Sequence, residues 1–221
     1  MNLTISKARK SFGKRKILDN TGFTCNTGEI TAIFGRNGSG KSTLLKMLFG
    51  SMKANSLSIK INNKDWPAKD IIPYQKIAYL PQEPFLPRHY KVRDIIPLYY
   101  EGDCQDKMFY ADGIHPLLEK TAGSLSMGQN RYLELLLVSN LNHPFIMLDE
   151  PFSMIEPLYK EKIKDFLLEL KIKKGIILTD HYYTDVLEVS DRNLLLKEGK
   201  LITVNTIEEL TTHGYLKAVN L

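Results

Sequence analysis

The chain has 221 residues, of which 43% are hydrophobic and 25% are charged, and its formal net charge is +5. This length suits one large domain with room for a small subdomain, and the composition is ordinary for a soluble globular protein. No apolar stretch is long enough for a membrane-spanning helix, and the N-terminus lacks the apolar core of a signal peptide.

Short strand patterns dominate the N-terminal part of the chain. Residues 3–5 alternate like a strand, residues 12–16 have turn and charge character, and residues 17–24 predict a second strand. Residues 56–61 alternate cleanly between polar and apolar side chains, which is typical of a half-buried strand. We therefore expect a small antiparallel sheet near the N-terminus.

A glycine-rich stretch, Gly35-Arg-Asn-Gly-Ser-Gly-Lys-Ser42, stands between an apolar strand pattern at 29–34 and a helical pattern at 43–49. Strand, glycine loop and helix are the context of a phosphate-binding loop of the form GxxxxGK[ST]. The glycines let backbone amides approach a polyphosphate, and the helix start adds its positive end. Lys41 is expected to reach the β and γ oxygens and Ser42 to bind Mg²⁺. A chance glycine turn is the alternative, and the flanking elements argue against it.

The middle of the chain predicts a small helical insertion at 88–121. A strand is expected at 77–80, followed by a proline-rich loop at 83–87. Residues 92–100 have a helical pattern that Pro97 disturbs, and residues 102–115 are polar and expected to be irregular.

Strands and helices alternate through the second half of the chain. Residues 123–129 predict a loop ahead of a mostly buried helix at 131–138, and apolar residues recur at helical spacing from 155 to 170. The other expected elements are strands at 145–148 and 175–178, a hairpin over 194–204 and a short terminal helix that begins at 207–210.

The predicted fold class is α/β, because strands alternate with helices after the glycine loop. We expect a P-loop NTPase core with a mostly parallel sheet, a small N-terminal antiparallel β subdomain and a short helical subdomain. The whole chain, 1–221, is expected to be a single domain, with the helical subdomain inserted at about 88–140.

The motifs together resemble the nucleotide-binding subunit of an ATP-binding cassette (ABC) transporter. The resemblance covers nearly the whole chain and rests on five features in the order of that family. These are the phosphate loop, Gln82, the segment Leu125-Ser-Met-Gly-Gln129, the strand that ends in Asp149 and Glu150, and His181. A phosphate loop alone would indicate only a P-loop NTPase, whereas the five together are specific.

The resemblance implies a catalytic role for Glu150, His181 and Lys41. Asp149 ends a strand beside the phosphate loop, where a carboxylate can hold Mg²⁺ through water. Glu150 is expected to point away from Asp149 and to orient or deprotonate the attacking water. His181 follows a strand and, in the family, contacts the γ-phosphate. A structural histidine and a solvated strand-end acid are the weaker alternatives.

The family likeness also implies the residues that contact ATP and the metal ion. Phe12 stands where the family stacks an aromatic ring on adenine, although a core phenylalanine is the alternative. The expected ATP contacts are Phe12, Gly35, Asn37, Gly38, Ser39, Gly40, Lys41, Ser42, Thr43, Gln82, Ser126, Gly128 and Gln129. The expected Mg²⁺ ligands are Ser42, Gln82 and Asp149.

The segment 125–129 resembles the family's signature loop, usually Leu-Ser-Gly-Gly-Gln. Ser126 and the amide of Gly128 can bind a γ-phosphate at a helix N-terminus, and in the family that phosphate belongs to ATP held by the opposite subunit. A serine N-cap without this role is the alternative. The expected assembly is therefore a homodimer, or a pair with another ATPase subunit, that holds two ATP molecules between the copies.

Two residues depart from the family pattern within these motifs. Met127 replaces the first glycine of the signature pair, which would cause strain if the position required a positive φ. Glu156 stands in the loop after Glu150, where the family usually has aspartate.

The expected function is ATP hydrolysis that drives a transmembrane permease subunit. The alternatives are a non-transport ABC ATPase, a weakly hydrolysing regulatory subunit, and a small-molecule kinase that would have no use for the signature loop. A lysine-rich solvated surface is the simplest explanation of the net positive charge, and attraction to anionic lipid head groups is a second one. No nucleic-acid partner is expected. Cys25 and Cys104 have no metal-ligand spacing. We expect a cytoplasmic protein at the inner face of the membrane.

Overall fold

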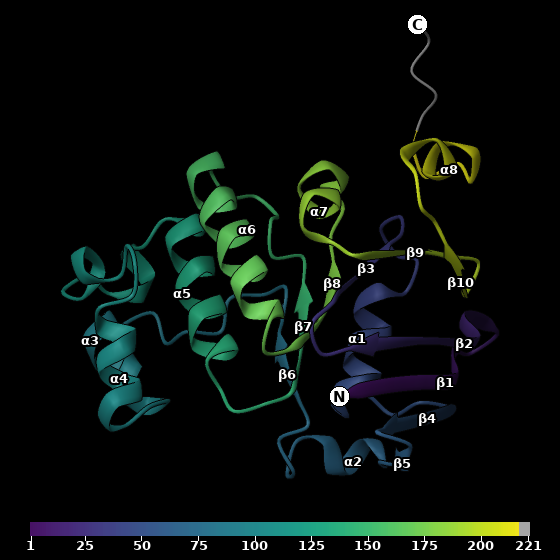
Figure 1. Ribbon diagram of the computed structural model, residues 1–221, viewed down its shortest axis with the longest axis horizontal. Coiled ribbons are helices and arrows are strands. Elements are labelled where there is room, and N and C mark those ends of the chain that lie inside the picture. Colours follow the sequence, from purple (N-terminus) through teal and green to yellow (C-terminus); the bar gives the residue numbers. More distant parts are fainter. Residues whose placement is uncertain (217–221) are drawn as a thin grey trace, which may run out of the picture.

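Two β-sheets form the framework of the computed structural model, which describes residues 1–216 (Figure 1). The larger sheet has six strands in the order β10-β9-β3-β8-β7-β6. Its strands are β3 (Ile30–Phe34), β6 (Ile77–Leu80), β7 (Phe145–Asp149), β8 (Gly175–Thr179), β9 (Arg192–Lys197) and β10 (Lys200–Thr203). All neighbours are parallel except β9 and β10, which form the predicted hairpin.

The centre of this sheet is buried on both faces, as continuous apolar strands require. Every residue of β3, β7 and β8 is buried. The register pairs Asp149 at the end of β7 with Thr179 at the end of β8. Because the carboxyl ends of parallel strands share one edge, the polar residues after these strands gather beside the phosphate loop.

The second sheet is small and antiparallel, as predicted. Its order is β2-β1-β4-β5, from the strands β1 (Asn2–Phe12), β2 (Arg15–Asn26), β4 (Ser56–Ile61) and β5 (Lys64–Asp65). Helix α1 (Lys41–Phe49) packs between the two sheets, since its buried Leu44, Leu45 and Leu48 share one apolar cluster with Leu3 of β1 and Ile33 of β3.

Another group of helices covers the other face of the large sheet (Figure 1). Helices α5 (Met127–Ser139), α6 (Pro157–Lys171) and α7 (Tyr183–Val189) pack there in a second apolar cluster. Two short helices, α2 (Ala68–Ile71) and α8 (Ile207–Thr212), lie in connections of the chain. Alternate side chains of β3 enter opposite clusters, Ala32 on one face and Ile33 on the other, as the period of a strand demands.

The segment between β6 and α5 is helical over more of its length than predicted. It contains α3 (Val92–Ile95), α4 (Gly102–Phe109) and the short 3₁₀ turns Ile96–Leu98, His115–Leu117 and Ala122–Ser124. The prediction of an irregular segment at 102–115 is wrong, because its first half is α4. The helix has few apolar residues, and it is anchored by the buried Met108, whose sulfur lies 3.5 Å from the Asn140 amide nitrogen of the α5 C-cap.

Helix α5 begins four residues earlier than expected. Residues 127–129 were predicted to lie in a loop, whereas they form the first turn of α5. Ser126 caps this turn, and its capping box with Gln129 supplies the local hydrogen bonds that apolar periodicity alone does not reveal.

Candidate functional site

The phosphate-binding loop joins β3 to α1 and is shaped by two left-handed glycines. Gly38 (φ 75°) and Gly40 (φ 110°) adopt a backbone conformation that other residues rarely tolerate, and Gly40 is the N-cap of α1. A Cβ at Gly40 would lie 2.6 Å from Cγ2 of Ile17, so the position also needs glycine for space. The Nζ of Lys41 donates to the carbonyl oxygen of Gly35 at 2.7 Å, which holds the side chain along the loop.

Asp149 is fully buried and accepts hydrogen bonds from three hydroxyl groups. Its Oδ1 lies 2.7 Å from Oγ1 of Thr179 and 3.2 Å from Oγ of Ser42, and its Oδ2 lies 3.0 Å from the hydroxyl of Tyr79. Burial raises the pKa of Tyr79, and the charge of Asp149 raises it further, so the phenol remains a donor. The carboxylate is thus oriented by residues of α1, β6 and β8.

Glu150 follows directly but turns to a different set of partners. Its backbone is left-handed (φ 54°), which is uncommon for a residue other than glycine and marks a constrained position. Its Oε2 accepts from Nε2 of Gln82 at 2.9 Å and from Oγ of Ser153 at 3.2 Å. Nδ1 of His181 lies 3.5 Å from the same oxygen. The strained turn therefore separates the two adjacent carboxylates.

The loop that carries His181 is held by the buried Asp180. The carboxylate of Asp180 accepts from the backbone amides of His181 at 2.7 Å, Tyr182 at 3.0 Å and Phe152 at 2.8 Å. Burial raises the pKa of Asp180, and these amides act against that shift by stabilising the charged form. Asp180 thereby ties the end of β8 to the loop after Glu150.

Lys41 is the cation at the centre of this acidic group. Burial lowers the pKa of its ammonium, whereas the nearby carboxylates of Glu150, Asp149 and Asp180 act in the opposite direction. A buried cation beside a loop of glycine amides is an arrangement suited to a polyanion.

These groups surround one cavity of about 600 Å³. Phe12 stands at its rim with 53% of its surface exposed, and Nζ of Lys10 lies 4.8 Å from the ring centroid. Arg15, Ser153 and Met154 also line it, although they were not predicted. The predicted residues that line the cavity are Phe12, Asn37, Gly38, Gly40, Lys41, Ser42, Thr43, Gln82, Glu150 and His181.

Six predicted residues do not line this cavity. Asp149 is covered and reaches the site through Ser42, Gly35 is buried within the loop, and Ser39 faces a neighbouring pocket. Ser126, Gly128 and Gln129 belong to the start of α5, on a different part of the same chain.

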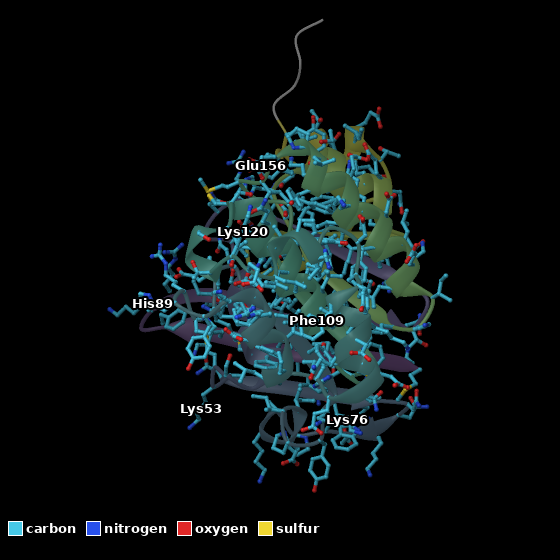
Figure 2. The ribbon with its side chains drawn as sticks, turned by 90° about the vertical axis from the view of Figure 1, so that its left-hand side faces the viewer. Lys53, Lys76, His89, Phe109, Lys120 and Glu156 are labelled. Carbon is cyan, nitrogen blue, oxygen red and sulfur yellow. The ribbon has the colours of Figure 1, made fainter. Side chains whose placement is uncertain are left out.

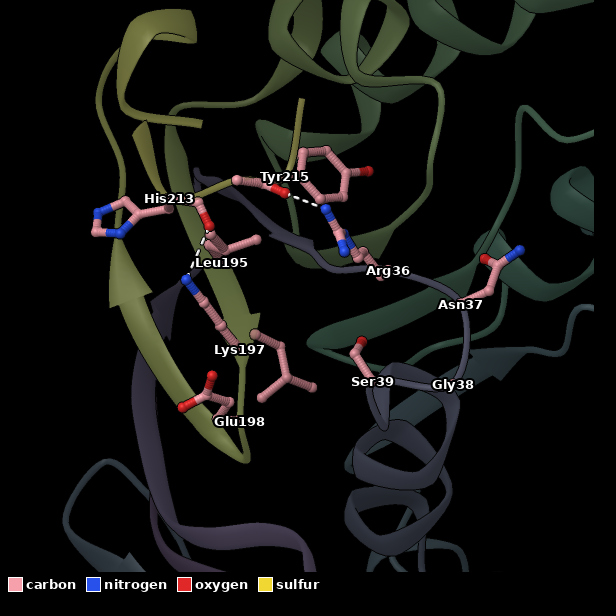
Figure 3. A pocket seen from close by; sticks show the side chains of 11 residues that line it. Arg36, Asn37, Gly38, Ser39, Leu195, Lys197, Glu198, His213 and Tyr215 are labelled. Atoms are coloured by element: carbon pink, nitrogen blue, oxygen red, sulfur yellow. Dashed lines mark hydrogen bonds between the residues drawn. The ribbon is translucent and has the colours of Figure 1, made fainter. Parts of the chain in front are cut away.

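The neighbouring pocket, of about 410 Å³, lies between the outer side of the loop and the C-terminal part of the described chain (Figure 3). Arg36 donates to the carbonyl oxygen of Gly214 at 2.5 Å, and Lys197 donates to that of His213 at 2.9 Å. The ring of Tyr215 also packs on Phe34 with centroids 5.8 Å apart. These contacts hold the segment after α8 against the phosphate loop.

The start of α5 is capped from within. Oγ of Ser126 accepts from the amide of Gln129 at 3.2 Å, and Oε1 of Gln129 accepts from the amide of Ser126 at 3.1 Å. Met127 is the first residue of this right-handed helix and is 57% exposed. The conformation therefore imposes no positive φ on the methionine.

Comparison with known proteins decides the family. Residues 18–153, more than half of the chain, match the model of the ABC transporter family. The chain belongs to this family. The lipopolysaccharide export system ATP-binding protein LptB of Haemophilus influenzae is 28% identical over 99% of this chain and 96% of its own length. An uncharacterized ABC transporter ATP-binding protein of Methanocaldococcus jannaschii, MJ1023, is 30% identical over 94% and 79%.

Solved structures agree with this family assignment. A nucleotide-free ATP-binding cassette from an ABC transporter matches with a TM-score of 0.84 and 25% identity over 99% of this chain and 97% of that chain. The ABC cassette MJ1267 matches with a TM-score of 0.81 and 27% identity over 95% and 93%. This ABC protein is accordingly an ATPase that binds ATP with Mg²⁺ and couples hydrolysis to transport. Within residues 1–216, no helix has the length and apolarity needed to cross a membrane.

The residues present fit a magnesium ion that is shared with a nucleotide. Ser42 and Asp149 bring a hydroxyl and a carboxylate oxygen within 3.2 Å of each other beside the phosphate loop, and hard oxygen donors are what Mg²⁺ prefers. No group of three or more His, Cys, Asp or Glu side chains that could hold a metal occurs in the described part of the chain. An ion here would therefore depend on the triphosphate for much of its coordination.

Sequence reasoning missed several residues that support the site of this ABC protein. Arg131 is buried, and its guanidinium donates to the carbonyl oxygens of Pro81 at 2.6 Å and Asp149 at 2.5 Å. The buried Glu134, 3.5 Å from Arg131, also accepts from the amide of Phe85 at 2.9 Å. Two opposite charges three residues apart in the otherwise apolar stretch 131–138 were the available signal.

Proposed function

We propose that this ABC ATPase binds two MgATP molecules between two copies of the chain, or between this chain and a paired ATPase subunit, and that closure of the pair drives a membrane permease. One observation carries the proposal. Lys41, Ser42, Gln82, Glu150 and His181 line a single cavity, whereas the signature residues at the start of α5 lie outside it. A site that is incomplete in one chain in this way is suited to completion by a second chain.

Within the cavity, each side chain has a chemical task that its surroundings support. Lys41 and the loop amides bind the phosphate chain, and Ser42, Gln82 and Asp149 are the residues that would hold the ion. Glu150 orients the attacking water and accepts its proton, and His181 holds the γ-phosphate in line. Mg²⁺ would neutralise charge on the β and γ oxygens during transfer.

The partner chain supplies the remaining contacts. Ser126 and the amide of Gly128 would bind the γ-phosphate of the opposite ATP, because a helix N-terminus attracts anions. Binding energy then closes the pair, and hydrolysis with loss of phosphate reopens it. The inserted helical subdomain, about 88–140 within a single domain, would transmit this motion to the permease.

The relatives favour transport over the other readings. LptB is named for lipopolysaccharide export, and another relative, RbsA of Chromobacterium violaceum, is named for ribose import. We therefore place this chain at the inner face of a cell membrane beside a polytopic partner, and not in a non-transport ABC protein or a small-molecule kinase. The rate of ATP hydrolysis, measured with the permease present, would distinguish an active subunit from a weakly hydrolysing regulatory one.

The test is the Glu150→Gln variant. It should keep ATP binding, lose at least about 100-fold in steady-state phosphate release, and accumulate a dimer in MgATP. Light scattering after size exclusion measures the dimer, and Glu161→Gln, a solvent-facing change on α6, is the matched control. Unchanged hydrolysis by Glu150→Gln would falsify the role of Glu150, and a strictly monomeric variant would contradict the dimer.

A further inference from the structure

Glu156 is the residue immediately before α6, and its side chain does not cap that helix. Its backbone is extended (φ −66°, ψ 150°), which makes it the N-cap, but the carboxylate forms no cap hydrogen bond within the described chain. Glutamate is longer than the residues that normally cap a helix, namely Ser, Thr, Asp and Asn. The side chain is therefore available for another contact.

That contact is with the first turn of α5. A Cβ built on Gly128 would lie 2.2 Å from Oε2 of Glu156 and 2.8 Å from Cδ2 of Tyr159. The carboxylate thus rests on the bare backbone of Gly128, in space that any side chain at that position would occupy. Figure 2, viewed from the side of α3 and α4, shows Glu156 above Lys120 and Phe109.

This carboxylate lies beside the N-terminus of α5, which carries the positive end of the helix dipole. The capping box uses Ser126 and Gln129, whereas the amides of Met127 and Gly128 have no hydrogen-bond acceptor among residues 1–216. Glu156 itself forms no ion pair with a lysine, arginine or histidine in that same range. A negative charge near unpaired amides at a helix start is favourable.

From this juxtaposition we infer that Glu156 is a positioning residue that competes with the partner's γ-phosphate for the first turn of α5. The inference rests on the proposed function, in which that turn acts on ATP held by the other chain. In the single chain the carboxylate lies against Gly128. When two chains close on ATP, we expect it to swing away, because two anions close to the same helix start repel each other.

The length of the side chain and its charge both matter for this competition. Glu156→Gln keeps the shape and removes the charge, so it should ease closure. Glu156→Asp is one methylene shorter, which withdraws the carboxylate from Gly128 and allows it to cap α6. A residue with only a structural role would affect stability in these variants and would not alter the dependence of dimerisation on ATP.

The experiment measures dimer formation against MgATP concentration in the Glu150→Gln background, with the full chain. Adding Glu156→Gln should lower the half-maximal MgATP concentration by about three- to tenfold, and Glu156→Asp should lower it as well. Adding the control change Glu161→Gln, whose carboxylate binds Lys164 on α6, should leave it unchanged.

The outcomes separate the two proposals. If Glu150→Gln dimerises and Glu156→Gln leaves the half-maximal concentration where it was or raises it, the competition is overturned while the dimer stands. If no variant dimerises at any MgATP concentration, the dimer and the competition fall together. The affinity of the monomer for ATP, measured with a fluorescent analogue, should be the same in all variants. If that affinity changed by the same factor as the half-maximal MgATP concentration for dimer formation, the inference would also be contradicted.

Discussion

At the scale of single residues, the site is set in place by hydrogen bonds before any ligand arrives. Both carboxylate oxygens of Asp149 accept hydrogen bonds, from the hydroxyl groups of Ser42, Tyr79 and Thr179. Glu150 accepts hydrogen bonds from Gln82 and Ser153. Groups fixed in this way lose little freedom when substrate binds, which favours rapid chemistry.

Ser126 offers a test in which two roles of one residue can be separated. Ser126→Ala removes the acceptor for the amide of Gln129 and should cost about 0.5–2 kcal/mol of unfolding free energy. Ser126→Asp keeps a capping acceptor, so its stability should stay close to wild type, but its charge should repel the partner's phosphate and abolish dimerisation in MgATP. Chemical denaturation and light scattering measure the two effects, and an aspartate variant that still dimerises would contradict the phosphate role.

At the scale of elements, a partly buried ion cluster joins α6 to α7, the helix that follows His181. Asp185 lies 2.7 Å from Nζ of Lys160 and 2.9 Å from Nζ of Lys164, and Lys164 also pairs with Glu188. Partial burial would raise the pKa of Asp185, but hydrogen bonds from the two lysines outweigh it and hold the pKa below its ordinary value. The cluster should therefore stabilise the packing of these helices.

We predict that Asp185→Asn lowers the free energy of unfolding by about 1–3 kcal/mol at neutral pH, because it leaves two lysines short of a partner. A depressed folded-state pKa contributes stability that is fully present above the unfolded pKa of about 3.9 and is lost as pH falls through the folded value. The difference in free energy of unfolding between wild type and Asp185→Asn should thus become smaller below about pH 4.

The matched control is Asp112→Asn, which breaks an ion pair with Lys162 in which the aspartate is 79% exposed. That change should cost less than about 1 kcal/mol at any pH. Urea unfolding curves over a pH series measure both variants, and equal effects of the two substitutions would show that burial of the α6–α7 cluster has no energetic consequence.

At the scale of the whole molecule, the cavity is built from both sheets. Phe12 comes from the small antiparallel sheet, Lys41 from the helix between the sheets, and Glu150 and His181 from the ends of strands in the large sheet. A ligand that touches all of these parts stabilises the entire fold, because it binds only when they are assembled.

Saturating MgATP, at about 100 times the dissociation constant, should therefore raise the free energy of unfolding by about 2.7 kcal/mol. Removal of Mg²⁺ with a chelator should reduce the shift, and Lys41→Met, which deletes the buried cation, should nearly abolish it. Lys46→Met, at an exposed position on the same helix, is the control and should keep the shift. Thermal denaturation measures each case, and full stabilisation of Lys41→Met by MgATP would refute the placement of the phosphates.

Local patterns in the sequence were enough to predict most helices and strands and to locate the main motifs. The strand, glycine loop and helix around Lys41, the strand that ends at Asp149 and the strand that precedes His181 lie where apolar periodicity and turn residues predict them, since each depends on neighbours in the chain. The mostly parallel sheet followed from the alternation of strands and helices. The sequence did not predict helix α4, because Met108 is its one buried residue and a single buried position gives no helical periodicity.

The tertiary structure alone decided which side chains surround those motifs. Tyr79 and Thr179 reach Asp149 only because parallel register aligns three strand ends, and Arg131 joins Pro81 to Asp149 from a helix in another part of the chain. The carboxylate of Glu156 meets Gly128 because α5 and α6 pack side by side. Such contacts depend on packing between distant segments, which the order of residues does not display.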